Sequence, residues 1–117
     1  MFERIDTIVI GAGQAGLAAS ACLSDAGIDH VVLERGAVAE RWRNERWASL
    51  KLLTPNWMTR LPGHSYNGND PDGYMHKDEV TSFLTHYAQR INAPIRCNAP
   101  VQFVTHDGEN YRVESGA

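Results

Sequence analysis

Two runs of β-branched residues near the start of the chain enclose a stretch of small apolar residues. The runs at 5–10 and 28–33 predict strands, because branched side chains favour extended backbone. The residues that fall at helical spacing between them are Leu17, Ala18, Ala21 and Leu23. Gly27 stands where a helix C-terminal glycine belongs. The order strand, helix, strand predicts the βαβ unit of a parallel sheet.

A second helix is predicted over 76–91, where one face is apolar throughout. The residues of that face recur with a period of 3.6 and are Val80, Phe83, Leu84, Tyr87, Ala88 and Ile91. Asp78 and Glu79 in the first turn and Arg90 in the last suit the helix dipole. We interpret the apolar face as a packing surface.

The remaining segments are short and rich in turn residues. Residues 50–53 predict an extended segment that enters a turn at Thr54-Pro55, and 63–74 has the composition of a loop. Residues 101–105 and 111–114 predict two strands joined by a turn. The pattern as a whole predicts an α/β fold.

The turn between the first strand and the first helix carries the pattern G-x-G-x-x-G, at Gly11, Gly13 and Gly16. In a dinucleotide-binding βαβ unit the first glycine allows a tight turn, the second leaves room for the pyrophosphate, and the third lets helix and strand pack closely. The amides at 13–15 would then face the phosphates at the positive end of the helix dipole. We therefore predict a dinucleotide site; a glycine turn that binds no phosphate is the alternative.

Glu34 follows the second predicted strand, 18 residues after Gly16. An acid in this place can accept hydrogen bonds from two ribose hydroxyls, and its charge would repel a 2′-phosphate. We expect the site to prefer FAD or NAD to NADP.

Length and charge limit the remaining possibilities. A chain of 117 residues has room for one domain with one modest core. The formal net charge of −3 favours neither a nucleic-acid partner nor an anionic membrane. Cys22 and Cys97 stand apart without metal-ligand spacing, and unpaired cysteines fit the cytoplasm. We predict no metal site, no membrane span and no signal peptide.

Arginine and tryptophan are interleaved with acids over 35–46. This segment can be a partly exposed helix whose tryptophans pack on the domain, or it can fold back over the dinucleotide, with Arg35 beside the adenosine and Trp42 against ribose or pyrophosphate. Stacking on single-stranded nucleic acid is a third interpretation, but Glu40 and Glu45 oppose it by offsetting part of the positive charge.

Several segments carry a family resemblance. They are D-T-I-V-I-G-A-G-Q-A-G-L-A at 6–18, V-V-L-E-R at 31–35, E-R-W-R at 40–43, S-L-K-L-L-T-P at 49–55 after Trp47, and M-H-K-D-E-V at 75–80. Together they are similar to the N-terminal part of flavin-containing monooxygenase-like FAD-dependent oxidoreductases, and the similarity covers essentially the whole chain. Ser20 is a mild departure, because the family more often has a small apolar residue there.

The resemblance implies a Rossmann-like FAD/NAD(P)-binding βαβ start followed by a β-meander, here as an incomplete three-layer doubly wound domain. Residues 1–117 would be a partial FAD-binding domain. The second glycine motif, which marks the family's NADPH-binding domain, is absent from this sequence. We therefore expect FAD as the cofactor, and NADPH only in the complete architecture.

The resemblance also implies the cofactor contacts. The FAD pyrophosphate would lie among Gly11, Gly13, Gln14, Ala15 and Gly16, and the adenosine ribose at Glu34. Further contacts would come from Arg35, Arg41, Trp42, Thr54 and the main chain of Val101. No residue is predicted to be catalytic, because the cofactor carries the chemistry.

We interpret the chain as the FAD-binding N-terminal portion of a flavin-dependent monooxygenase or related oxidoreductase. The complete enzyme would use NAD(P)H and dioxygen on a small-molecule substrate, and the fragment alone is expected to be inactive. An NAD-dependent dehydrogenase domain is one alternative, because the βαβ start serves NAD equally well. A non-catalytic nucleotide-binding fragment, completed by a C-terminal partner segment, is another.

Overall fold

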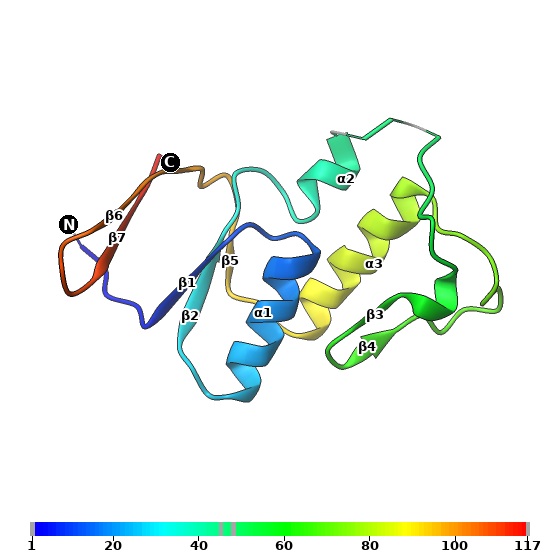
Figure 1. The fold of residues 1–117 in the computed structure, drawn as a ribbon, viewed down its shortest axis with the longest axis horizontal. Coiled ribbons are helices and arrows are strands. Elements are labelled where there is room, and N and C mark those ends of the chain that lie inside the picture. Colours follow the sequence, from blue (N-terminus) through cyan, green and yellow to red (C-terminus); the bar gives the residue numbers. More distant parts are fainter. Residues whose placement is uncertain (1, 45, 48, 117) are drawn as a thin grey trace.

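A three-stranded parallel sheet organises the molecule. The computed structural model describes residues 2–44, 46–47 and 49–116. The strand order is β1 (Thr7–Ile10), β2 (His30–Leu33), β5 (Ile95–Arg96) (Figure 1). Ile10 pairs with Leu33, so β1 and β2 end at the same level. The glycine turn after β1 and Glu34 after β2 therefore meet at one edge of the sheet.

The first helix, α1 (Gln14–Asp25), connects β1 to β2 and buries Leu17, Ser20 and Ala21. It ends in a Schellman motif, in which Ile28 N donates to Leu23 O at 2.9 Å and Gly27 N donates to Ser24 O at 3.0 Å. Gly27 has a φ of +69°, which a side chain would disfavour. The predicted helix and its terminal glycine are confirmed.

The helix α3 (Lys77–Arg90) lies beside α1 (Figure 1). Its face enters the core as predicted: the buried members are Val80, Leu84, Tyr87 and Ala88, and the partly buried members are Phe83 and Ile91. The hydroxyl of Tyr87 donates to Pro62 O at 2.7 Å. This bond fixes α3 to the segment between the two helices.

That segment holds α2 (Glu40–Asn44), the short 3₁₀ helix η1 (Asn56–Met58), and the paired strands β3 (Arg60–Leu61) and β4 (His64–Ser65). The prediction of a loop over 63–74 is wrong at its start. Gly63 has a φ of +75°, and the turn that it makes brings His64 opposite Leu61.

The antiparallel hairpin of β6 (Val101–His106) and β7 (Tyr111–Ser115) lies at the opposite end of the molecule from β3 and β4 (Figure 1). Both predicted strands are confirmed to within one residue. The hairpin exposes Phe103 and Tyr111, at 61% and 74%. An isolated two-stranded hairpin is only marginally stable, so we expect another element to pack on these aromatic side chains.

The parallel sheet differs from the sequence prediction at the starts of β1 and β2 and in β5. The first strand begins at Thr7 rather than at residue 5. The second strand begins at His30 rather than at residue 28, because the Schellman motif takes up the residues before it. The strand β5 was not predicted at all, and it has only two residues. Its position is set by partners far along the chain, since Val32 N donates to Pro94 O and Glu34 N to Arg96 O.

Candidate functional site: a glycine turn beside an apolar cavity

The glycine turn has the geometry that its sequence predicts. Gly11 leaves β1 with a φ of +103°, and its N–H donates to Leu33 O at 2.8 Å. A Cβ placed on Gly16 would lie 1.8 Å from Gly11 O, so only glycine allows α1 to approach the turn this closely. A Cβ placed on Gly13 would meet nothing within 4 Å. The chain thus has open space at Gly13 and tight packing at Gly16.

The start of α1 offers main-chain donors to this open space. The first hydrogen bond of the helix runs from Leu17 N to Gly13 O at 3.0 Å, so the amides of Gln14, Ala15 and Gly16 precede the helical ladder. No side chain caps the helix at Gly13. Unpaired amides at the positive end of a helix dipole favour an anion. The turn therefore fits the diphosphate of a dinucleotide.

Glu34 is buried at 6% exposure, directly beside the glycine turn. One carboxylate oxygen accepts the N–H of Ala12 at 3.0 Å, and the other accepts the N–H of Gly36 at 2.7 Å. Because Ala12 lies between the first two glycines, the acid braces the phosphate-facing turn. A carboxylate oxygen can accept more than one hydrogen bond, so the ribose contact expected of Glu34 stays a prediction.

A cavity of about 140 Å³ has Gln14 in its wall, together with Trp42 and Thr54. These three predicted cofactor residues come from separate segments, and only the folded chain brings them together. The rest of the wall is mostly apolar and consists of Leu52, Met58, Thr59, Arg60, Leu61, Met75, Val80, Phe83 and Leu84. An apolar hollow next to a turn whose main-chain amides favour an anion suits a ligand with a flat ring at one end and a phosphate linker behind it.

Part of this wall was not anticipated. From the sequence, packing is the favoured role of Val80, Phe83 and Leu84 and cofactor contact the minor alternative, and all three also line the cavity. Leu52 and Met75 enter the wall through a main-chain pair, in which Leu52 N donates to Met75 O at 2.9 Å. The position of Leu52 two residues before Thr54 was the one signal in the sequence that could have placed it in this wall.

The remaining predicted residues do not line this cavity. Arg35 follows Glu34 directly, and Arg41 is exposed on α2. Val101 begins β6, and the chain just before it is tied to the site because Ala99 N donates to Glu34 O at 2.8 Å. Glu45, part of the predicted charged segment, lies outside the described residues.

Ser20 of α1 and His30 of β2 form a buried polar pair. The Ser20 Oγ lies 2.7 Å from His30 Nε2, and His30 Nδ1 lies 3.1 Å from Ile28 O. If Nδ1 carries the proton and donates to this carbonyl, Nε2 accepts from the serine hydroxyl. The family more often has a small apolar residue at position 20. A serine fits there in this chain because its hydroxyl has a hydrogen-bond partner inside the core.

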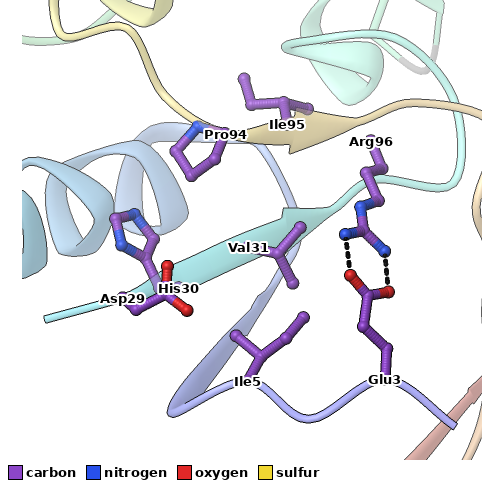
Figure 2. A pocket seen from close by; sticks show the side chains of 8 residues that line it. All are labelled: Glu3, Ile5, Asp29, His30, Val31, Pro94, Ile95 and Arg96. Carbon is purple, nitrogen blue, oxygen red and sulfur yellow. Dashed lines mark hydrogen bonds and ion pairs between the residues drawn. The ribbon is translucent and has the colours of Figure 1, made fainter.

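A larger cavity of about 320 Å³ lies between the N-terminal segment and the strands β2 and β5 (Figure 2). At its edge the guanidinium of Arg96 faces the carboxylate of Glu3, with two contacts of 2.7 Å. This pairing lowers the pKa of Glu3, but an exposed ion pair adds little to stability. Since the wall contains none of the predicted cofactor residues, we place the functional site at the smaller cavity.

Two further observations concern the described part of the chain. It holds no group of three or more His, Cys, Asp or Glu side chains that could bind a metal ion. None of its helices has the length and apolar character needed to cross a membrane.

Comparison with known proteins places these features in a family. The family model for pyridine nucleotide-disulphide oxidoreductases matches residues 8–117. The chain is 39% identical over 114 residues to an uncharacterized CzcO-like oxidoreductase of Geobacillus kaustophilus, covering 97% of this chain and 32% of that one. It is 36% identical over 104 residues to the probable indole-3-pyruvate monooxygenase YUCCA1 of Arabidopsis thaliana, covering 88% and 25%.

Among solved structures, a flavin-containing monooxygenase from Stenotrophomonas maltophilia superposes with a TM-score of 0.81 at 32% identity. The match covers 97% of this chain and 34% of that chain. The chain thus spans about a third or less of the length of the relatives that it matches. The glycine turn, the α/β fold and these matches agree, and the chain belongs to the pyridine nucleotide-disulphide oxidoreductase family, as a flavin-containing monooxygenase-like member of it.

Proposed function

We propose that residues 1–117 are the FAD-binding N-terminal portion of a flavin-dependent monooxygenase. The Arabidopsis and Stenotrophomonas relatives, both monooxygenases by name, support the reaction class. In this proposal the complete protein uses NAD(P)H and dioxygen to oxygenate a small-molecule substrate. The NADPH-binding domain would belong to the part of the protein that this chain does not span.

The observation that carries the proposal is the continuity of the site. Glu34, the open space at Gly13 and the apolar cavity follow one another from the end of β2, across the glycine turn, to Gln14. FAD has the same order of parts: an adenosine, a diphosphate and a ring system. We therefore assign the ribose to Glu34, the diphosphate to the turn and the ring half to the cavity.

The remaining predicted contacts keep their roles within this proposal. Arg35 and the main chain of Val101 would lie beside the adenosine, and Arg41 would add positive charge near the phosphates. Trp42 and Thr54 would contact the cofactor from the cavity wall. Bound FAD supplies the redox and oxygen chemistry, whereas the residues of this chain bind it, orient it and exclude water.

The test is direct binding of FAD to the purified protein. We expect the preparation to quench flavin fluorescence on titration and to release a flavin spectrum on denaturation. A colourless preparation that binds NAD but not FAD would support the dehydrogenase alternative and contradict the proposal.

The two free cysteines, both exposed, support a cytoplasmic location.

A partner-completed module without activity of its own is the second candidate, favoured by the exposed hairpin. Mixing the chain with a separately produced C-terminal portion and measuring NADPH-driven oxygen uptake separates the two. A gain of activity supports a divided enzyme, and FAD binding without such a gain supports the inactive module.

A further inference from the structure

One residue of α3, Lys77, is bonded to two points of the chain that follows Trp42. Lys77 Nζ donates to the carbonyl of Arg43 at 3.1 Å. The main-chain N–H of the same lysine donates to the carbonyl of Leu50, also at 3.1 Å. Lys77 therefore joins the end of α2 to the start of the strand-like segment at 50–52.

The position of Lys77 on its own helix is unfavourable. It is the first residue of α3, where the positive end of the helix dipole disfavours a cation, while the acids Asp78 and Glu79 that follow it suit that end. The carbonyl of Arg43 belongs to the last turn of α2, where carbonyls lack helical partners and a cation is favoured. The lysine charge is thus unfavourable at the start of α3 and favourable at the end of α2.

Other described hydrogen bonds hold the start of α2. Ala39 N donates to Ala12 O at 3.0 Å, and the Glu40 carboxylate accepts the N–H of Ala37 at 2.9 Å. None of the described residues of α2 is fully buried. Figure 1 shows this short helix beside the N-terminal end of α3. At the far end Trp42 packs against the core, and the bond from Lys77 ties the main chain there to α3.

We propose that Lys77 is a positioning residue for the bound dinucleotide. By fixing the C-terminal end of α2, it holds Trp42 in the cavity wall together with Gln14 and Thr54. Lys77 itself makes no contact with the cofactor. The inference rests on the proposed function, because it assumes that the ligand of this cavity is FAD.

The first test compares FAD affinity among lysine variants. Lys77→Met removes the ammonium but keeps the stem, and we expect the dissociation constant to rise about three- to tenfold, as for the loss of one hydrogen bond. Lys77→Arg should restore binding to within about twofold. Lys51→Met is the matched control, since Lys51 is exposed on the segment that pairs with His76. Wild-type affinity in Lys77→Met, or no recovery in Lys77→Arg, would overturn the inference.

A second test asks whether the lysine acts through the indole. In a Trp42→Ala background, Lys77→Met should cause no further loss of FAD affinity. A full additional three- to tenfold loss in that background would mean that Lys77 acts elsewhere, which contradicts its positioning role.

Hydrogen exchange without FAD separates this inference from the proposed function. We expect amides at 41–44 to exchange faster in Lys77→Met than in the wild type, with no change in α1. Unchanged exchange at 41–44, or faster exchange throughout, would overturn the inference even if FAD binds. If the protein binds no FAD, the proposed function fails, and the exchange result still decides whether Lys77 holds α2.

Discussion

Gly13 and Gly16 lie three residues apart and have opposite surroundings. Open space surrounds the position of a Cβ at Gly13, whereas main-chain atoms fill it at Gly16. The two glycines therefore serve different ends. One keeps a surface free for a ligand, and the other allows the helix to lie against the turn.

Substitution at Gly13 should affect binding far more than stability. Gly13→Val places a branched side chain where the diphosphate would lie, so we expect no detectable FAD binding by fluorescence titration. The free energy of unfolding should change by no more than about 1 kcal/mol, the cost of a poorer helix N-cap residue. Unchanged affinity would remove the diphosphate from this turn.

Substitution at Gly16 is the matched contrast. Gly16→Ala brings a methyl group into overlap with the carbonyl of Gly11. We expect a loss of at least about 1–3 kcal/mol in urea unfolding without any ligand, as for other overpacked sites. Wild-type stability in this variant would show that the turn and helix do not pack as described.

Glu34 has a structural role in addition to its expected binding role. Its two oxygens accept the amides of Ala12 and Gly36. Glu34→Ala should therefore lower the free energy of unfolding by roughly 1–3 kcal/mol without ligand, and should weaken FAD binding by a similar amount. Glu34→Gln keeps one acceptor oxygen and should lose less of both, as measured by urea unfolding and FAD titration. An alanine variant with unchanged stability and affinity would contradict both roles.

At the level of elements, α3 joins the two halves of the core. It packs on α1 and bonds through Tyr87 to Pro62, next to the β3–β4 turn. His64 of β4 stacks on this helix, with ring centroids 4.6 Å from Phe83 and 5.4 Å from Tyr87. The titratable imidazole of His64 therefore lies at the contact between β4 and α3.

This ring should make the protein less stable in acid. Burial lowers the pKa of His64, and the nearby charges of Arg90 and His86 act in the same direction. The unfolded chain takes up a proton on this residue near pH 6.5, while the folded chain takes it up only at lower pH. Stability should therefore fall as the pH drops below about 6.5.

The variant His64→Phe tests this because it keeps an aromatic ring on the helix. We expect its melting temperature to decrease less than that of the wild type between pH 8 and pH 5. Equal decreases in the two proteins would show that other groups set the acid sensitivity.

The molecule as a whole exposes more surface than its size requires. Its accessible area is 7877 Å², whereas a compact monomer of this mass exposes about 6,300 Å². Its radius of gyration is 15.8 Å, compared with about 13 Å for a compact chain of this length. The hairpin of β6 and β7, which stands apart from the α3 end, contributes to both differences (Figure 1).

A longer protein should protect this hairpin. We expect a chimera that continues this chain with the C-terminal two thirds of the Geobacillus relative to slow amide exchange in β6 and β7 and to bind FAD more tightly. The isolated chain is the control. Equal exchange in the two proteins would contradict the idea that further elements cover the hairpin.

Local patterns in the sequence were sufficient for much of the fold. The βαβ unit, the helix at Lys77–Arg90 and the hairpin strands each depend on side chains a few residues apart, so periodicity and glycine placement predict them. β3, β4 and β5 escaped prediction, because two residues carry no period. The pairing of β5 is in addition set by β2, far away in the sequence.

The same distinction holds for the site. The sequence by itself determined the glycine turn and the acid that follows β2, because a positive φ, a close approach and an exposed helix start each demand a particular residue type at a fixed spacing. Only the tertiary structure decided that Gln14, Trp42 and Thr54 share one cavity, and that Lys77 holds α2 from another helix. Those contacts join residues from separate segments, and the packing of the whole chain sets the distances between them.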